Sequence, residues 1–127
     1  MTEADGLPEP ILLTLPAQPR FLRIARLVAA GLANDVGADI DALDDVRLAV
    51  GEVCGLAIAA GAPTIELRFE VSADSLMLSG EATPTPTALD PEHMQLAEQI
   101  LRVATARYEL TCDSNAVSFQ LYFRSGH

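Results

Sequence analysis

The sequence predicts an α+β fold of the two-layer α/β sandwich type, with helices on one face of a mainly antiparallel mixed sheet. Its 127 residues, 50% of them hydrophobic, suffice for one buried core but not for two. The spacing of the apolar residues alternates between the helical period and the strand period of two, in the order β-α-α-β-β-α-β-β. We therefore expect a short flexible lead over residues 1–9 and one domain over residues 10–124.

The domain is expected to begin with an edge strand and a helix. The run Ile-Leu-Leu-Thr-Leu at residues 11–15 favours a strand, and Pro16 stops it because proline has no backbone N–H to pair. From Pro19 onward apolar residues recur at i, i+3 and i+4, which predicts a helix that Gly37 ends. Basic residues of this helix form a stripe roughly opposite its apolar face: Arg20, Arg23 and Arg26.

A second, longer helix is expected from about residue 39 to Ala60. Apolar residues occupy more than one of its sides, so we predict that it is buried on most sides. Leu48 and Leu56 flank the acid Glu52 on one of these sides. Acidic residues near the helix start are favoured by the helix dipole, and docking of a basic partner is the alternative interpretation: Asp39, Asp41, Asp44 and Asp45.

A β-hairpin and a loop follow the second helix. Residues 65–71 alternate apolar and charged side chains without interruption, which indicates a strand with one buried face. A turn at residues 72–74 leads to the second strand of the hairpin at residues 75–79. Residues 80–89, rich in Thr and Pro, are expected to form an extended loop.

A third helix and a second hairpin complete the chain. Asp90 is a suitable N-cap and Pro91 a suitable first helical residue. Strands are predicted around residues 108–112 and 117–123, joined by a turn at residues 113–115. The predicted inner face of the helix consists of Met94, Ala97, Leu101 and Ala104.

Charge and residue usage exclude several classes of function. The chain carries 18 acidic and eight basic residues, for a net charge of −10, and every basic residue is arginine. The absence of lysine excludes a Schiff-base amine and a P-loop lysine, and the acidity argues against direct binding of nucleic acid or an anionic membrane. No apolar run is long enough to span a bilayer and the N-terminus lacks a signal-peptide pattern, so we expect a cytoplasmic protein.

The cysteines and histidines do not predict a metal site. Cys54 and Cys112 lie within apolar patterns and have no CxxC or Cys/His neighbour. Two buried thiols are therefore expected in place of a disulfide or a metal pair. His93 and His127 are isolated in the sequence.

The most informative stretch is D-V-R-L-A-V-G-E-V-C-G-L-A over residues 45–57, between the arginine-bearing helix and a β-hairpin. It resembles the N box of the bacterial RsbW-type anti-sigma-factor serine kinases, where a helix of the pattern D-V-x-L-A-V-x-E-x-x-x-N belongs to the GHKL, or histidine-kinase-like ATPase, fold. The resemblance extends over roughly residues 10–124. The matching residues are Asp45, Leu48, Ala49, Val50, Glu52 and Cys54.

The resemblance implies that an acid at the position of Glu52 accepts the proton of the phosphorylated hydroxyl and that an asparagine four residues later holds Mg²⁺. In this chain the later position is Leu56, whose hydrocarbon offers the cation no oxygen. Glu52 is therefore interpreted as a vestigial base, partly exposed or in contact with a partner.

The family's glycine boxes are also absent. The resemblance implies a D-x-G-x-G box after the hairpin, whose Asp binds the adenine amino group and whose glycines let the backbone approach the nucleotide. Ungapped placement puts Gly80, Ala82 and Pro84 at these three positions, and a shift by one brings Glu81 to the Asp position without restoring the glycines. Residues 88–93, where the family has a phosphate-binding turn, contain no glycine. We expect no catalytic residue, no nucleotide site and no metal; ATP and Mg²⁺ would be cofactors only of an active kinase.

The resemblance finally implies a regulator in transcription that binds and sequesters a sigma factor by partner switching and is released by a STAS-type anti-anti-sigma factor. The family uses the first helix in recognition, so Arg20, Arg23 and Arg26 are candidate partner-binding residues, with an ordinary solvated face as the alternative. Two other functions stay open. One is an active ATP-dependent serine kinase of an anti-anti-sigma factor. The other is a stand-alone interaction module, possible as a homodimer, with an unrelated regulatory partner.

Overall fold

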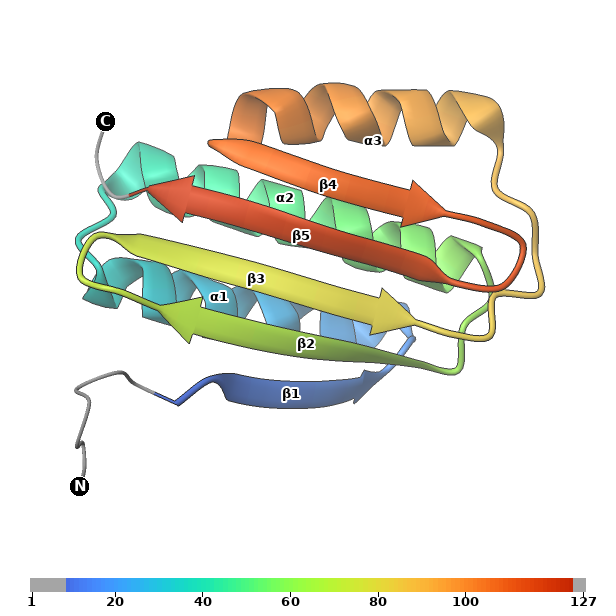
Figure 1. The fold of residues 1–127 in the computed structure, drawn as a ribbon, viewed down its shortest axis with the longest axis horizontal. Coiled ribbons are helices and arrows are strands. Elements are labelled where there is room, and N and C mark those ends of the chain that lie inside the picture. The colour runs from blue at the N-terminus through green and yellow to red at the C-terminus, as the bar shows by residue number, and fades with distance from the viewer. Residues whose placement is uncertain (1–8, 125–127) are drawn as a thin grey trace.

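Helices and strands follow one another in the predicted order in the computed structural model, which describes residues 9–124 (Figure 1). The elements are β1 (Ile11–Pro16), a 3₁₀ turn (Pro19–Phe21), α1 (Leu22–Asp35), α2 (Ile40–Ala59), β2 (Thr64–Val71), β3 (Ser75–Ala82), α3 (Pro91–Ala104), β4 (Arg107–Cys112) and β5 (Val117–Arg124). Except for residue 9, the predicted flexible lead lies outside the described residues.

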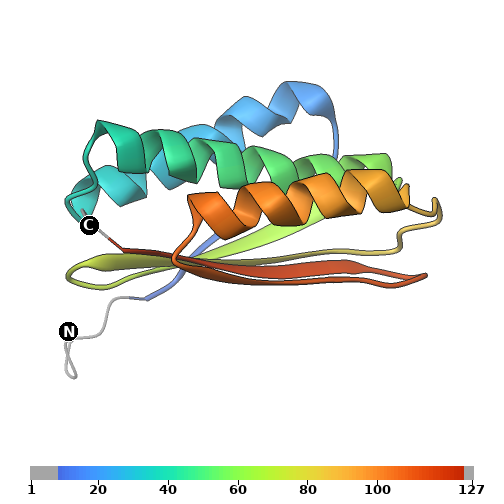
Figure 2. The same cartoon turned by 90° about the horizontal axis from the view of Figure 1, so that it is seen from above.

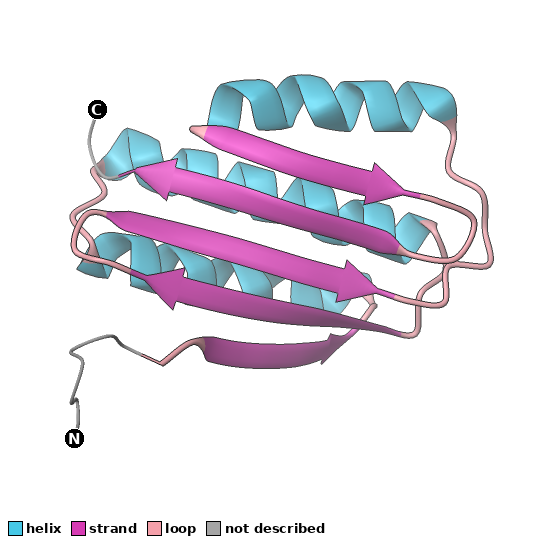
Figure 3. Ribbon diagram, viewed as in Figure 1, coloured by secondary structure: helices cyan, strands magenta, loops and turns pink. Residues whose placement is uncertain are grey.

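The strands form one sheet in the order β1-β2-β3-β5-β4, with β1 and β4 at its edges (Figure 3). Each neighbouring pair is antiparallel. The predicted sandwich and the edge position of the first strand are confirmed, whereas the expectation of a mixed sheet is wrong for the strands between residues 9 and 124. The β2–β3 and β4–β5 hairpins each reverse the chain direction, and β5 returns alongside β3 in the opposite direction. These pairs are therefore antiparallel.

All three helices lie on one face of the sheet, with α2 between α1 and α3 (Figure 2). The strands bury alternate side chains against this layer, as the patterns of β2 and β5 show most clearly. No helix within residues 9–124 covers the opposite face of the sheet. The central position of α2 confirms its predicted burial on most sides, and its buried residues are Val46, Ala49, Val50, Val53, Cys54, Leu56 and Ala57.

The helix ends agree with the sequence signals. The Asp39 side chain accepts a hydrogen bond from the Ala42 N–H at 2.8 Å, and the Asp90 side chain accepts one from the Glu92 N–H at 2.9 Å. Gly37 follows α1 with a φ of 93°, a conformation that favours glycine. No helix within the described part of the chain is long and apolar enough to cross a membrane.

Strand β3 is longer than predicted. Residues 80–82, expected to begin a loop, continue the strand: all three pair with β5, and Gly80 and Glu81 also pair with β2. A glycine normally weakens a strand, so the sequence pattern suggested an end there. The tertiary structure overrides this preference because Gly80 lies between two neighbouring strands, opposite Leu67 and Phe119.

Candidate functional site

The family's asparagine position is occupied by a buried hydrocarbon side chain. Leu56 has 0% of its surface exposed. Asp45, Glu52 and Leu56 are separated by seven and four residues, so they lie on one side of α2. Asp45 lines a cavity together with Val103 and Ala104 of α3, which places this side of α2 toward α3. Leu56 is therefore buried on the side of α2 that is turned toward α3, and it presents no oxygen to a cation.

Glu52 lies in a shallow hollow on the outer surface of the helix layer. The hollow has a volume of about 280 Å³ and is lined by Arg26, Arg47, Leu48, Gly51 and Glu52. Leu48 is 49% exposed, so the two leucines predicted to flank Glu52 differ: one is in solvent and the other is buried. The carboxylate of Glu52 is half-buried in the neighbourhood of two guanidinium groups.

Gly80 lies within the sheet, beneath an aromatic ring. A Cβ added at this residue would lie 2.5 Å from Cε1 of Phe119, nearer still to Cζ, and 3.0 Å from Cδ2 of Leu67. Ala82, two residues further, is buried on the same face. Glu81 points to the other face of the sheet, because successive side chains of a strand alternate. Neither Gly80 nor Glu81 thus presents a carboxylate toward the helices.

The segment between β3 and α3 is fastened to its surroundings. The Thr83 hydroxyl donates to the Asn115 carbonyl at 2.9 Å, and the Thr85 N–H donates to the same carbonyl at 3.0 Å. The Thr87 N–H donates to the Ala60 carbonyl at 3.0 Å. A Cβ at Gly61, whose φ is 82°, would lie 3.0 Å from the Thr87 hydroxyl. The segment is thereby held against the β4–β5 turn and the end of α2, and Pro84 in it follows a cis peptide bond.

The buried hydroxyl of Thr85 is expected to lower the stability of the folded protein. It is 4% exposed, and its hydroxyl has no hydrogen-bond partner among the described residues. Thr85→Val keeps the shape and removes the unpaired hydroxyl, so it should raise the free energy of unfolding by about 1 kcal/mol. Urea denaturation measures this change. Thr83→Val is the matched control, because it removes a formed hydrogen bond and should lower stability. A loss of stability in Thr85→Val would contradict the prediction.

The three candidate partner-binding arginines do not form one exposed stripe. Arg20 is exposed in the 3₁₀ turn with its guanidinium 4.8 Å from the centre of the Phe21 ring, and Arg23 is exposed on α1. Arg26 is half-buried and lies over Gly51 of α2, where an added Cβ would be 2.8 Å from its Nη2. The predicted placement of Arg26 opposite the buried face is therefore wrong.

The reason lies in which residues of α1 are buried. Sequence spacing centred the buried face on the large side chains from Phe21 to Leu32, but these are only half-buried. The fully buried residues are alanines, which allow α1 to approach α2 closely. These buried alanines are Ala25, Ala29, Ala30 and Ala33. Residue 26 lies on the same side of the helix as they do.

The two thiols are free, as predicted, and Cys54 is fully buried while Cys112 is half-buried. Burial raises the pKa of the Cys54 thiol from 9.0 to about 12, although the Arg26 guanidinium acts in the opposite direction. The folded-state pKa is thus above the unfolded one. Its contribution to stability is complete below the unfolded pKa of 9.0 and is lost as the pH rises through the folded value of about 12.

We expect Cys54 to resist thiol reagents in the folded protein, because the attacking species is the thiolate. In a Cys112→Ser variant at about pH 8, a disulfide reagent should label no thiol in buffer and one thiol per chain in urea. Absorbance of the released thiol measures the labelling. Rapid labelling of this variant in buffer would contradict the prediction.

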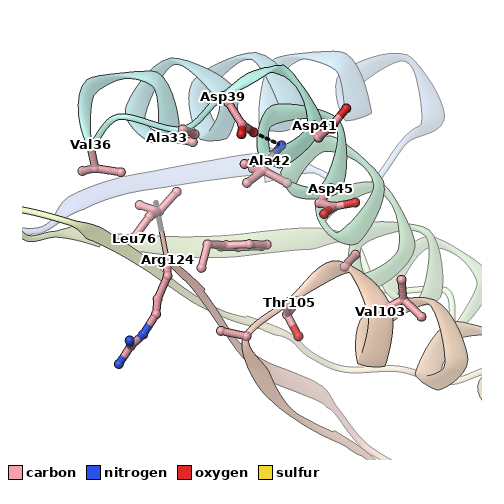
Figure 4. A pocket seen from close by; sticks show the side chains of 15 residues that line it. Ala33, Val36, Asp39, Asp41, Ala42, Asp45, Leu76, Val103, Thr105 and Arg124 are labelled. Atoms are coloured by element: carbon pink, nitrogen blue, oxygen red, sulfur yellow. Dashed lines mark hydrogen bonds between the residues drawn. The ribbon is translucent and has the colours of Figure 1, made fainter. Parts of the chain in front are cut away.

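The predicted acidic cluster lines a cavity of about 450 Å³ at the other end of α2 (Figure 4). Asp39, Asp41 and Asp45 contribute from α2 and its cap, opposite Val103 of α3, while the Arg124 side chain extends away from the aspartates. Burial raises the pKa of Asp45, and the charges of Asp41, Asp44 and Asp39 raise it further.

Sequence reasoning found the aspartates but not the cavity, since the cavity depends on where α3 and β5 end. Its walls also contain Phe123 and Leu76 from the sheet. Thr85 and Phe119 are further residues of structural consequence; the sequence placed them in a loop and on one side of a strand, but it did not predict the contacts that they make. Between residues 9 and 124 no three His, Cys, Asp or Glu side chains are grouped so that they could hold a metal ion.

Comparisons with known proteins agree on one family. The histidine kinase-like ATPase domain matches residues 15–98. The serine-protein kinase RsbW of Halalkalibacterium halodurans is 40% identical over 47 residues, which are 37% of this chain and 29% of that protein. RsbW of Bacillus licheniformis is 33% identical over 66 residues, which are 48% of this chain and 41% of that protein. The matches therefore span less than half the length of these relatives.

A solved structure shows the same fold. The crystal structure of the RsbU and RsbW domains of Rv1364c from Mycobacterium tuberculosis superposes with a TM-score of 0.65 at 15% sequence identity, covering 92% of this chain and 32% of that chain. The domain match covers well over half of the sequence, and the structural match covers nearly all of it. The chain therefore belongs to the histidine kinase-like ATPase domain family, with the GHKL fold, and part of it is similar to RsbW serine-protein kinases.

Proposed function

We propose that this chain is an anti-sigma-factor-like regulator that binds and sequesters a sigma factor, or a STAS-type antagonist of one, without ATP-dependent phosphorylation. The observation that carries the proposal is the complete burial of Leu56 at the position of the family's metal-binding asparagine. Mg²⁺ requires oxygen ligands in a nearly octahedral arrangement. A fully buried leucine at this position supplies no ligand oxygen.

Two other features support loss of the nucleotide site. Phe119 occupies the space above Gly80, where the family's adenine-binding Asp is expected by ungapped placement. The segment that leads into α3 is held to Asn115 and Ala60 by hydrogen bonds, and it contains proline where the family has glycine. These residues do not fit an Mg²⁺-nucleotide, and the proposal assigns no catalytic residue and no cofactor.

Binding to a protein is the activity that remains, and the charge of −10 suits a basic partner. Sigma factors bind DNA and carry basic surfaces, so an acidic antagonist gains association rate and selectivity from the complementary charge. Sequestration would act by steric occlusion. Release would then follow from competition between partners instead of from the ADP or ATP state of the chain.

An active serine kinase is the second candidate, because Glu52 is the glutamate that the family uses as its catalytic base, and it is half-exposed on α2. Calorimetric titration with ATP and Mg²⁺ separates the two candidates, with an ATP-binding RsbW relative as the positive control. We expect no binding at micromolar ATP. Micromolar binding together with phosphate transfer to a STAS protein would establish the kinase instead.

The partner class is tested by affinity capture from the native cell followed by mass spectrometry. The proposal expects a sigma factor or a STAS protein. Reproducible recovery of a different protein with neither of these would favour the third possibility, an interaction module with an unrelated regulatory partner.

A further inference from the structure

Exposed apolar side chains form a stripe along α3. Leu96 is 54% exposed and Val103 is 81% exposed, although the helix already buries a separate inner face against the core. The two residues are seven positions apart, roughly 10 Å along the helix axis, and Ile100 lies between them on the same side. Such a repeat of apolar residues on a solvent-exposed helix side is typical of a surface that contacts another helix.

This side of α3 is turned toward the acidic side of α2. Val103 lines the 450 Å³ cavity together with Asp41 and Asp45, so the stripe ends at the aspartates (Figure 4). Leu48, one turn beyond Asp44 on α2, adds a further apolar side chain that is 49% exposed. We call this surface the α2–α3 face; it consists of Asp41, Asp45, Leu48, Leu96, Ile100 and Val103.

The charged residues of the α2–α3 face are all acidic, and Arg26 and Arg47 border the face beside Leu48. Asp41 and Asp45 lie near Asp39 and Asp44, and of these four only Asp44 has an ion pair within the described residues, with Arg47 at 3.1 Å. The raised pKa of Asp45 reflects burial and the repulsion of the other three. A cationic group placed here would relieve that repulsion, so the face has the electrostatic character that a basic ligand requires.

We propose that the α2–α3 face is a docking site for a basic amphipathic helix of a partner protein. A helix with apolar residues at i, i+4 and i+7 matches the spacing of Leu96, Ile100 and Val103, while Lys or Arg beside them reaches Asp41 and Asp45. This inference deepens the proposed function, on which it rests, because it names the surface and the chemistry of the bound segment.

A second copy of this chain is the less suitable occupant. Two copies would bring two charges of −10 together, and the same aspartates would face each other across a symmetric contact. A basic helix gains from the same charges. The apolar stripe and the aspartates thus point to one kind of occupant.

Fluorescence anisotropy with the whole chain tests the proposal. The probe is a labelled synthetic peptide of about 15 residues that has leucines at helical i, i+4, i+7 and i+11 positions and lysines on both sides of them. The control peptide has the same composition, with the leucines spread around the helix. We expect the first peptide to bind at least about tenfold more tightly than the second, and its affinity to fall with salt.

Variants of the chain locate the site. Leu96→Ser with Val103→Ser, and separately Asp41→Asn with Asp45→Asn, should each weaken binding about tenfold, and the Asn pair should also reduce the salt dependence. Leu27→Ser, at an α1 leucine that is 73% exposed, is the apolar control. Glu66→Gln with Glu81→Gln, a cross-strand pair on the open sheet face, is the charge control. Both controls should change affinity less than about twofold.

Other outcomes overturn the proposal: absence of saturable binding, equal binding of the two peptides, or equal affinity of the α2–α3 face variants and wild type. Circular dichroism verifies that the variants are folded, as the exposure of the replaced side chains leads us to expect. If affinity capture recovers a sigma factor or STAS protein but the peptide-binding experiments fail, the inferred docking site is wrong and the proposed function stands. If the peptide-binding experiments give the expected results but affinity capture recovers neither protein, the proposed function is wrong and the docking site stands.

Discussion

Leu56→Asn is expected to lower the free energy of unfolding by about 4 kcal/mol, even though it restores the residue that the family carries. The substitution removes a fully buried hydrocarbon side chain and puts an amide without hydrogen-bond partners arranged for it in its place. Because domains of this size are stable by only about 5–15 kcal/mol, this is a large fraction of the total. Urea denaturation followed by circular dichroism measures the change.

Leu48→Asn is the matched control for Leu56→Asn. It makes the same chemical change two turns earlier on the same helix, at a side chain that is 49% exposed, and should cost less than about 1 kcal/mol. We also expect calorimetry to show no gain of ATP binding in Leu56→Asn, since the glycine boxes are still missing. A stable variant that binds ATP would mean that the rest of the pocket is intact.

Gly80→Asp is expected to be more disruptive still, because it places a branched, charged side chain where the Phe119 ring lies. Gly80→Ala isolates the steric part of this effect: its Cβ alone would lie 2.5 Å from Cε1 of Phe119. We expect Gly80→Ala to lower stability by about 2–3 kcal/mol and Gly80→Asp to prevent folding or to lower stability further. Thermal and urea denaturation provide the measurements.

Gly31→Ala is the control for Gly80→Ala. No atom lies within 4 Å of its added Cβ, and the residue is exposed within α1, so alanine should stabilise the protein by about 0.5–1 kcal/mol. Phe119→Leu removes the ring, and in that background Gly80→Ala should lose much of its effect. Equal effects of Gly80→Ala with and without the ring would show that the clash with Phe119 is not the cause.

Leu56→Asn and Gly80→Asp connect the fold to the proposed function. Each would bring back a residue of the family's nucleotide site, and each is opposed by packing that this chain has built in its place. The Phe119 ring fills the space at residue 80, and the buried Leu56 side chain fills the space at residue 56, so single restorations are expected to lose stability before they gain a ligand. This is the physical basis for proposing a binding protein in place of a kinase.

The local elements could be predicted from the sequence because the signals for them are local. Alternation over residues 65–71 identified a half-buried strand, and Asp39, Asp90 and Pro91 marked helix starts that the structure contains. The pattern of residues 45–57 identified the family, and the composition established the acidic charge. Side-chain period, capping and net charge all depend on neighbours in the chain, so one sequence was enough to find them.

What only the tertiary structure decided involves contacts between elements far apart in the chain. The extension of β3 through Gly80 depends on strand pairing with β2 and β5, and the partial burial of Arg26 depends on the packing of its side chain over Gly51 of α2. The cavity beside Asp45 exists because α3 ends next to the start of α2. A helix or strand pattern states which side of an element is apolar, but packing free energy is shared among elements, and only their assembly determines which side chain fills each space.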